Sequence, residues 1–119
     1  MGVTYNVRQV KGVTVVDLSG RITLGETSAA LHDLIRDLLK QGRKHILLNF
    51  RDVPYLDSSG IGELFGCFTT VRSQGGVLKL SNATERIQNL LRLTKLDTVI
   101  DVMEDESTAV QSFSKAGAA

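Results

Sequence analysis

Apolar and polar positions alternate with different periods in different parts of the chain, and this pattern predicts the order of its elements. Two short runs rich in β-branched residues come first, at residues 3–10 and 12–18. Lys11 and Gly12 join them, so we expect a β-hairpin. Residues 26–40 then place their apolar side chains on one helical stripe, with charged side chains opposite. The first part of the chain therefore predicts two strands followed by an amphipathic helix.

The middle of the chain predicts a buried strand and a second helix. Residues 45–50 (HILLNF) are almost continuously apolar, which fits a central strand covered on both faces. A helix is expected over residues 58–73, ended by Gly75 and Gly76. Its predicted inner face consists of large apolar residues, namely Ile61, Leu64, Phe65, Phe68 and Val71. Cys67, on the same helix, is expected to be a small, semi-buried filler.

The last part of the chain repeats the alternation of strand and helix. We expect a strand at residues 77–80, a helix at 84–95, a strand at 99–103 and a helix at 105–114, followed by a frayed tail. The complete order is ββαβαβαβα. Strands that alternate with helices predict an α/β fold with a mixed, mainly parallel sheet and about four helices, and the hairpin adds an antiparallel N-terminal edge strand.

Composition narrows the class of protein. The 119 residues suit one domain, and 42% hydrophobic residues suffice for a core. The net charge is only +1, from 14 basic and 13 acidic residues, which argues against a nucleic-acid partner. No apolar run approaches the ~20 residues that a membrane-spanning helix needs. With one cysteine, the chain is expected to be cytoplasmic and without an internal disulfide.

The stretch L-D-S-S-G-I-G, residues 56–62, lies between the apolar strand and the second helix. Ligands of open α/β sheets gather outside the carboxyl ends of strands, which is where this stretch is predicted to lie. Asp57 is suited to cap the helix, so Ser58 would be its first residue and would point outward. Gly60 and Gly62 remove side chains from the first turn. Ordinary helix capping would explain the aspartate and the serines. Each glycine inside a helix, however, lowers helix stability by ~1 kcal/mol relative to alanine. We therefore expect either tight packing or a bound molecule at these glycines.

The stretch does not match the sequence motifs of catalytic or cofactor-binding sites. A nucleophile elbow requires G-x-S-x-G, which neither Ser58 nor Ser59 satisfies. A dinucleotide fingerprint fails because Gly66 comes one residue late. His32 and His45 are predicted to lie far from the serines and from the cysteine, so neither a catalytic base nor a metal site is expected. No enzyme activity, cofactor or metal is therefore predicted, which leaves a serine presented for modification or a helix start used for docking.

The predicted fold together with R-D-V-P-Y-L-D-S-S-G-I-G resembles the anti-sigma factor antagonists, the bacterial members of the STAS-domain family. Residues 20–23 (GRIT) and the glycine pair before the strand VLKL add weaker likeness. The resemblance covers nearly the whole chain. It implies a single STAS domain over residues 1–119, with its core at about residues 5–113.

The resemblance implies a partner-switching function. Family members bind an anti-sigma factor that is also a serine kinase, and so release a sigma factor. The kinase phosphorylates the serine that follows the motif aspartate, which is Ser58 here, and a metal-dependent phosphatase reverses the reaction. The implied partner-binding residues are Thr23, Asp57, Ser58, Ser59, Gly60, Ile61 and Gly62. Many relatives carry an acidic residue where this chain has Thr23, which bears on recognition by the kinase.

Two other functions stay open at this stage. The glycine-containing helix start is also suited to hold the phosphate of a nucleotide or another small anion. Some family members are subunits of stress-sensing assemblies. For a free-standing antagonist we expect a monomer or weak dimer with protein partners and with no nucleic-acid or membrane partner.

Overall fold

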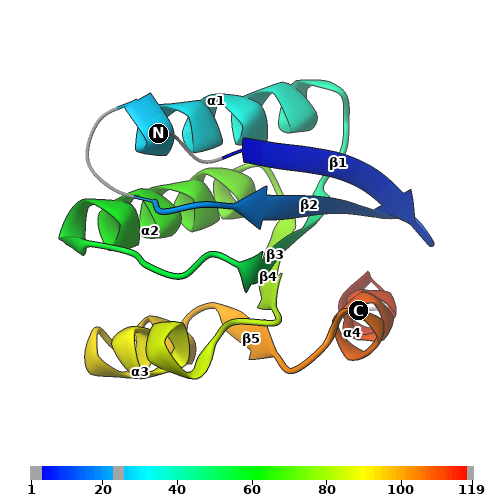
Figure 1. The fold of residues 1–119 in the computed structure, drawn as a ribbon. Helices are drawn as coiled ribbons and strands as arrows, with labels where there is room; N and C mark the ends of the chain where they lie inside the picture. Colours follow the sequence, from blue (N-terminus) through cyan, green and yellow to red (C-terminus); the bar gives the residue numbers. More distant parts are fainter. Residues whose placement is uncertain (1–3, 23–25, 118–119) are drawn as a thin grey trace.

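The computed structural model describes residues 4–22 and 26–117, and within these ranges the chain forms the predicted order of elements (Figure 1). The strands are β1 (Thr4–Val10), β2 (Val13–Ser19), β3 (His45–Asp52), β4 (Val77–Ser81) and β5 (Asp101–Met103). The helices are α1 (Glu26–Lys40), α2 (Ser58–Ser73), α3 (Glu85–Leu93) and α4 (Glu106–Gly117), with a short 3-10 helix at Leu96–Thr98.

The strands form a sheet in the order β1-β2-β3-β4-β5. β1 and β2 are antiparallel, and each later neighbour is added in parallel, so the predicted mixed sheet is confirmed. Lys11 and Gly12 form the hairpin turn with φ of 51° and 82°. Positive φ at both central residues is the conformation that matches the twist of two antiparallel strands.

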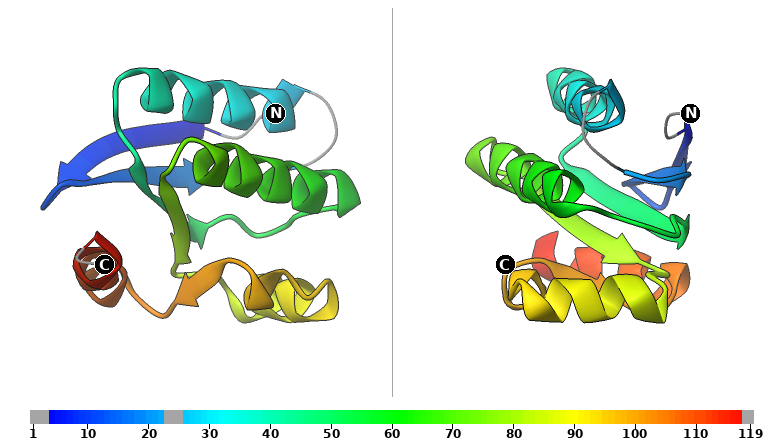
Figure 2. Two further views of the ribbon diagram at one scale, coloured as in Figure 1. Left: turned by 180° about the vertical axis from the view of Figure 1, so that it is seen from behind. Right: turned by 60° about the vertical axis from the view of Figure 1, so that its left-hand side comes forward.

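The sheet is covered on both faces, and the side chains of β3 show how. Ile46, Leu48 and Phe50 belong to the large core cluster that also contains residues of α1, α2 and α3. Leu47, between them, belongs to a second cluster with α4. Successive residues of a strand point to opposite faces, so α4 covers the face opposite to the other three helices (Figures 1 and 2). This explains the continuous apolar run of β3.

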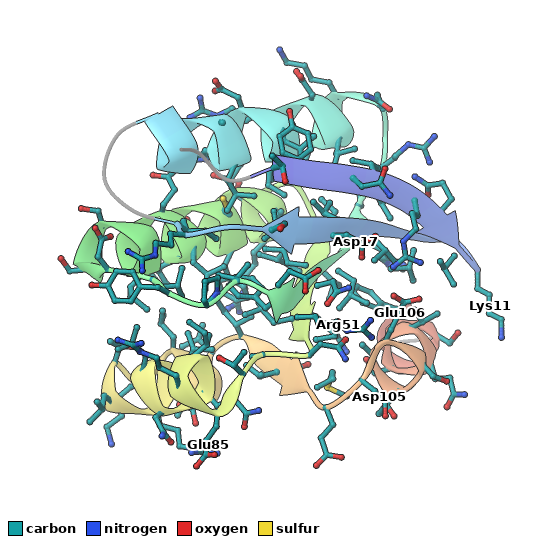
Figure 3. All side chains as sticks on the ribbon, in the orientation of Figure 1. Lys11, Asp17, Arg51, Glu85, Asp105 and Glu106 are labelled. Carbon is teal, nitrogen blue, oxygen red and sulfur yellow. The ribbon has the colours of Figure 1, made fainter. Side chains whose placement is uncertain are left out.

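Ion pairs between charged side chains link α4 to the β1–β2 hairpin. Arg8 on β1 contacts Asp17 on β2, with Nε to Oδ2 at 2.6 Å, and also reaches Glu106 in the first turn of α4. Asp17 and Glu106 are labelled in Figure 3. The hydrogen bonds from Arg8 hold the pKa of the Asp17 carboxyl below its usual value.

The last strand and the last helix differ from the sequence prediction at their boundaries. The last strand begins at Asp101 and not at residue 99, because the 3-10 helix intervenes and the Leu96 carbonyl accepts from the amides of Val99 and Ile100. The last helix continues to Gly117, beyond the predicted end at residue 114. Asp105 caps its start by accepting from the amide of Thr108 at 2.7 Å.

Residues 1–3, 23–25 and 118–119 lie outside the described residues. Three sequence predictions fall on them wholly or in part: the start of the first strand at Val3, the partner-binding role of Thr23 and the frayed tail. Within the described ranges, none of the helices combines the length and the apolar character needed to cross a membrane.

Candidate functional site

The segment between β3 and α2 is held in place by Ile22, which lies three residues beyond the end of β2. The amide of Ile22 donates to the carbonyl of Tyr55 at 3.1 Å, and the Ile22 carbonyl accepts from the amide of Asp57 at 3.4 Å. Ile22 thereby forms a parallel bridge with Leu56, and both side chains are buried. The sheet pairing thus continues past the strand ends and fixes the point where α2 begins.

Asp57 caps α2, as the sequence predicts. Its backbone is extended, with φ −96° and ψ −175°, and its Oδ1 accepts from the amide of Gly60 at 2.8 Å. The Asp57 carbonyl accepts the first helical bond, from the amide of Ile61 at 3.0 Å. The carboxylate therefore lies at the positive end of the helix and is committed to capping.

Ser58 is the first residue of α2 and is exposed, which confirms the prediction that it points outward. Ser59 is half-buried. The two adjacent hydroxyls thus differ in accessibility. An enzyme that approaches the molecule from solvent meets Ser58 more readily than Ser59.

The two glycines of the motif lie in different surroundings. Gly60 is buried, and a Cβ atom placed on it would lie 2.3 Å from the carbonyl oxygen of Ile22. Any side chain there would displace the backbone that anchors the site. Gly62 is exposed, and a Cβ atom on it would have nothing within 4 Å among the described residues. Packing therefore explains Gly60 and does not explain Gly62.

The outer surface of α2 is a stripe that begins at Ser58. Residues spaced by three or four positions share one face of a helix, and the exposed residues of this face are Ser58, Gly62, Phe65, Thr69 and Arg72. We call these five residues the outer stripe. Phe65 is 43% exposed, and its ring stacks on that of Phe68 with centroids 6.4 Å apart.

The prediction that Phe65 belongs to the inner face of α2 is wrong. The buried residues of this helix are Gly60, Leu64, Cys67 and Val71. Cys67 is fully buried, more than predicted, and occupies the inward place next to Leu64. Apolar character alone favours an inward Phe65, but the buried face of the helix passes through Leu64, Cys67 and Val71 and leaves Phe65 exposed.

Tyr55 lies beside the site between two arginines. The guanidinium carbon of Arg21 is 5.7 Å from the centre of its ring, and that of Arg86 is 5.4 Å away. With Pro54 these residues line a shallow hollow of about 180 Å³. Arg21, which follows β2, and Arg86 of α3 thus place positive charge beside Tyr55, two residues before the Asp57 cap.

The contact of α1 with α2 contains a cluster that the sequence did not reveal. His32 Nδ1 lies 2.7 Å from Oε1 of Glu63, and its Nε2 lies 3.0 Å from Oγ1 of Thr70. The expectation that His32 lies far from the cysteine is therefore wrong, because His32, Glu63 and Cys67 place donor atoms within 4.8 Å of one another. Glu63, Cys67 and Thr70 have the spacing of one helical face, but nothing in the sequence indicates which residue of another helix meets them.

Comparisons with known proteins concern the family and the fold of the chain. The family model described as STAS domain matches residues 4–109. The anti-sigma-B factor antagonist of Bacillus subtilis (strain 168) is 32% identical over 111 residues, which is 93% of this chain and 100% of that protein.

Solved structures show the same fold at lower identity. A crystal structure of a Thermotoga maritima protein superimposes with a TM-score of 0.83 at 23% identity, covering 91% of this chain and 92% of that one. The Bacillus cell fate determinant SpoIIAA in its phosphorylated form gives a TM-score of 0.70 at 19% identity, covering 92% and 99%. The matched family model, the relative at 32% identity and the observed ββαβαβαβα sheet together show that the chain belongs to the STAS-domain family.

Proposed function

We propose that this protein is an anti-sigma factor antagonist that is switched by phosphorylation of Ser58. In its unmodified form it binds an anti-sigma factor that is also a serine kinase, and a sigma factor is released. Transfer of phosphate from ATP to the Ser58 hydroxyl ends this binding, and a phosphatase restores it. The observation that carries the proposal is the exposed Ser58 hydroxyl, placed directly after the Asp57 cap at the start of the outer stripe.

The place of Ser58 makes the modification compatible with the fold. A phosphoserine adds about −1.5 to −2 charges and three acceptor oxygens. Negative charge at a helix N-terminus is stabilising, typically by ~0.3–1 kcal/mol and by up to ~2 kcal/mol. The hydroxyl is exposed, so the phosphate stays hydrated and the core beneath it is unchanged.

The same charge acts differently where a partner covers it. An interface removes water from the phosphate and can bring it close to other negative charge, and a like-charge contact costs several kcal/mol. A loss of ~4 kcal/mol weakens binding about a thousandfold. The interface penalty therefore exceeds the gain at the helix terminus, and the partner dissociates from a folded protein.

The outer stripe supplies the contact surface in this proposal. Gly62 leaves open space one turn from Ser58, and Phe65 offers an exposed aromatic ring about two turns from it. Exposed aromatic side chains are frequent anchors of protein interfaces. A partner that lies along this stripe would cover the Ser58 hydroxyl directly.

The alternative of a nucleotide or anion held by the helix start has less support. Such a ligand needs free amide groups in the first turn. The amide of Gly60 already donates to Asp57, and the Ile22 carbonyl fills the space beside Gly60. A role as a subunit of a larger stress-sensing assembly would use the same exposed surface, and it predicts a different partner.

The test is phosphorylation by the anti-sigma factor kinase of the same organism, with ATP, followed by intact mass measurement and mapping of the site. We expect one phosphate per chain, located on Ser58. Ser59→Ala is the matched control, because it removes the neighbouring hydroxyl and should still be phosphorylated. Ser58→Ala should accept no phosphate and should bind the partner constitutively. Full phosphorylation of Ser58→Ala would refute the assignment of the acceptor.

A further inference from the structure

The α1–α2 contact brings together three side chains with different donor atoms. They are His32 of α1 and Glu63 and Cys67 of α2, and their Nδ1, carboxylate oxygen and Sγ atoms all lie within 4.8 Å of one another. Glu63 and Cys67 are four residues apart, so both lie on the face of α2 that meets α1. The cluster is separate from Ser58, which lies on the outer stripe.

The imidazole of His32 is oriented by a second contact. Its Nε2 lies 3.0 Å from the hydroxyl of Thr70, one turn beyond Cys67 on the same face of α2. Histidines that bind metals usually have their other ring nitrogen held in this way, which fixes the orientation of the ring. Here the contact directs Nδ1 toward Glu63 and Cys67.

The three donors fit one class of ligand. Imidazole nitrogen, carboxylate oxygen and thiolate sulfur together favour Zn²⁺ over Mg²⁺ or Ca²⁺, which prefer oxygen alone. Tetrahedral Zn²⁺ has bonds of about 2.0–2.3 Å, which places neighbouring ligand atoms roughly 3.4–3.7 Å apart. The present separations, from 2.7 Å for nitrogen to oxygen up to the 4.8 Å limit, span this range. Side-chain shifts of about 1 Å suffice to reach it.

We propose that His32, Glu63 and Cys67 form a zinc-binding site that joins α1 to α2, with its fourth position open to water. The side chains of His32 and Glu63 are 20% and 24% exposed, so the ion enters from their side, and Cys67 forms the buried floor. With ligands on both helices, the bound ion would hold α1 and α2 together. The site does not depend on the proposed partner switch.

Binding requires the thiol of Cys67 to lose its proton. Burial, and next the Glu63 carboxylate, raise the pKa of this thiol to about 12, while Arg36 acts in the opposite direction. Without metal the thiol is protonated at neutral pH. The incoming ion takes the place of that proton, which passes to solvent, and it also replaces the contact of His32 with Glu63.

The test is titration of the full chain with Co²⁺ as a spectroscopic substitute for Zn²⁺, under reducing conditions. We expect one Co²⁺ per chain, with the near-ultraviolet sulfur-to-cobalt band and the strong visible bands of tetrahedral cobalt, and we expect Zn²⁺ to displace it. Cys67→Ala should abolish the sulfur band, and His32→Gln and Glu63→Gln should each weaken binding at least tenfold. His45→Gln is the matched control, because His45 packs on Phe113 away from this cluster.

X-ray absorption of the zinc-loaded, unmodified protein tests the site without any substitution. One sulfur ligand at about 2.3 Å and lighter ligands at about 2.0–2.2 Å are expected. A shell that contains only nitrogen and oxygen, an absent sulfur-to-cobalt band, or equal loss of binding in His45→Gln would overturn the proposal. The His32–Glu63 contact would then be a hydrogen-bonded link between helices and nothing more.

Discussion

The two faces of α2 separate the residues that build the fold from those available to a partner. The inner face consists of Gly60, Leu64, Cys67 and Val71, all buried. The outer stripe runs in parallel to it along the same helix and is exposed. Each face carries a motif glycine and a large apolar residue, so similar residue types are buried on one face and exposed on the other. Residue type in this motif therefore does not reveal whether a position is buried, whereas the side of the helix does.

Substitutions at the adjacent residues Leu64 and Phe65 should show the largest difference between the two faces in their effects on stability and binding. Leu64→Ala removes a fully buried side chain and should lower the free energy of unfolding by about 2–5 kcal/mol. Phe65→Ala removes a ring that is 43% exposed and should change stability much less. It should instead weaken binding of the anti-sigma factor about tenfold or more, as expected for an aromatic anchor. Urea unfolding and calorimetric titration measure the two quantities.

If Phe65→Ala costs as much stability as Leu64→Ala while binding is unchanged, the outer stripe has no separate role in binding.

The next largest difference in stability is expected between substitutions of the two motif glycines, Gly60 and Gly62. Gly60→Ala places a Cβ atom 2.3 Å from the Ile22 carbonyl and should destabilise the protein by about 1–3 kcal/mol, since overpacking forces the backbone to shift. Gly62→Ala meets open space and should stabilise the helix by up to about 1 kcal/mol. Thermal unfolding of both variants side by side measures the difference.

Gly62→Leu extends the same contrast to binding. The larger side chain should leave the melting temperature nearly unchanged and should weaken the partner complex if that surface is covered. A large fall in melting temperature would instead assign Gly62 to packing.

The smallest effect on stability is expected for substitutions of Asp57, which caps α2. Asp57→Ala removes the acceptor of the Gly60 amide and should cost about 1 kcal/mol of stability. Asp57→Asn keeps an acceptor oxygen and serves as the control, with a loss of only a few tenths of a kcal/mol. Equal losses in the two variants would show that the negative charge, and not the capping hydrogen bond, stabilises the start of α2.

Local features of this protein could be predicted from the sequence, because they depend on neighbours in the chain. The hairpin turn at Lys11 and Gly12, the Asp57 cap and the exposure of Ser58 are of this kind. The role of Gly60 could not be predicted, since it depends on the Ile22 carbonyl, 38 positions earlier in the chain. The contact of His32 with Glu63 likewise depends on how α1 lies against α2.

The sequence predictions were wrong where apolar character allowed two different structures. Phe65 is the larger and more apolar candidate for the inner face, yet Cys67 is buried there and Phe65 is exposed. The late start of β5 has a similar origin, because Val99 favours a strand by type while the 3-10 helix that precedes it keeps its backbone out of the sheet. In both places tertiary packing overrides local preference.

We propose that a phosphate on Ser58 removes the partner and leaves the domain folded. The most direct measurement compares the affinity for the anti-sigma factor and the free energy of unfolding on the same two samples, with and without phosphate on Ser58. We predict that affinity falls about a thousandfold, equivalent to ~4 kcal/mol, while the free energy of unfolding changes by no more than about 1–2 kcal/mol. Unchanged affinity, or a loss of affinity that accompanies unfolding of the domain, would contradict the account.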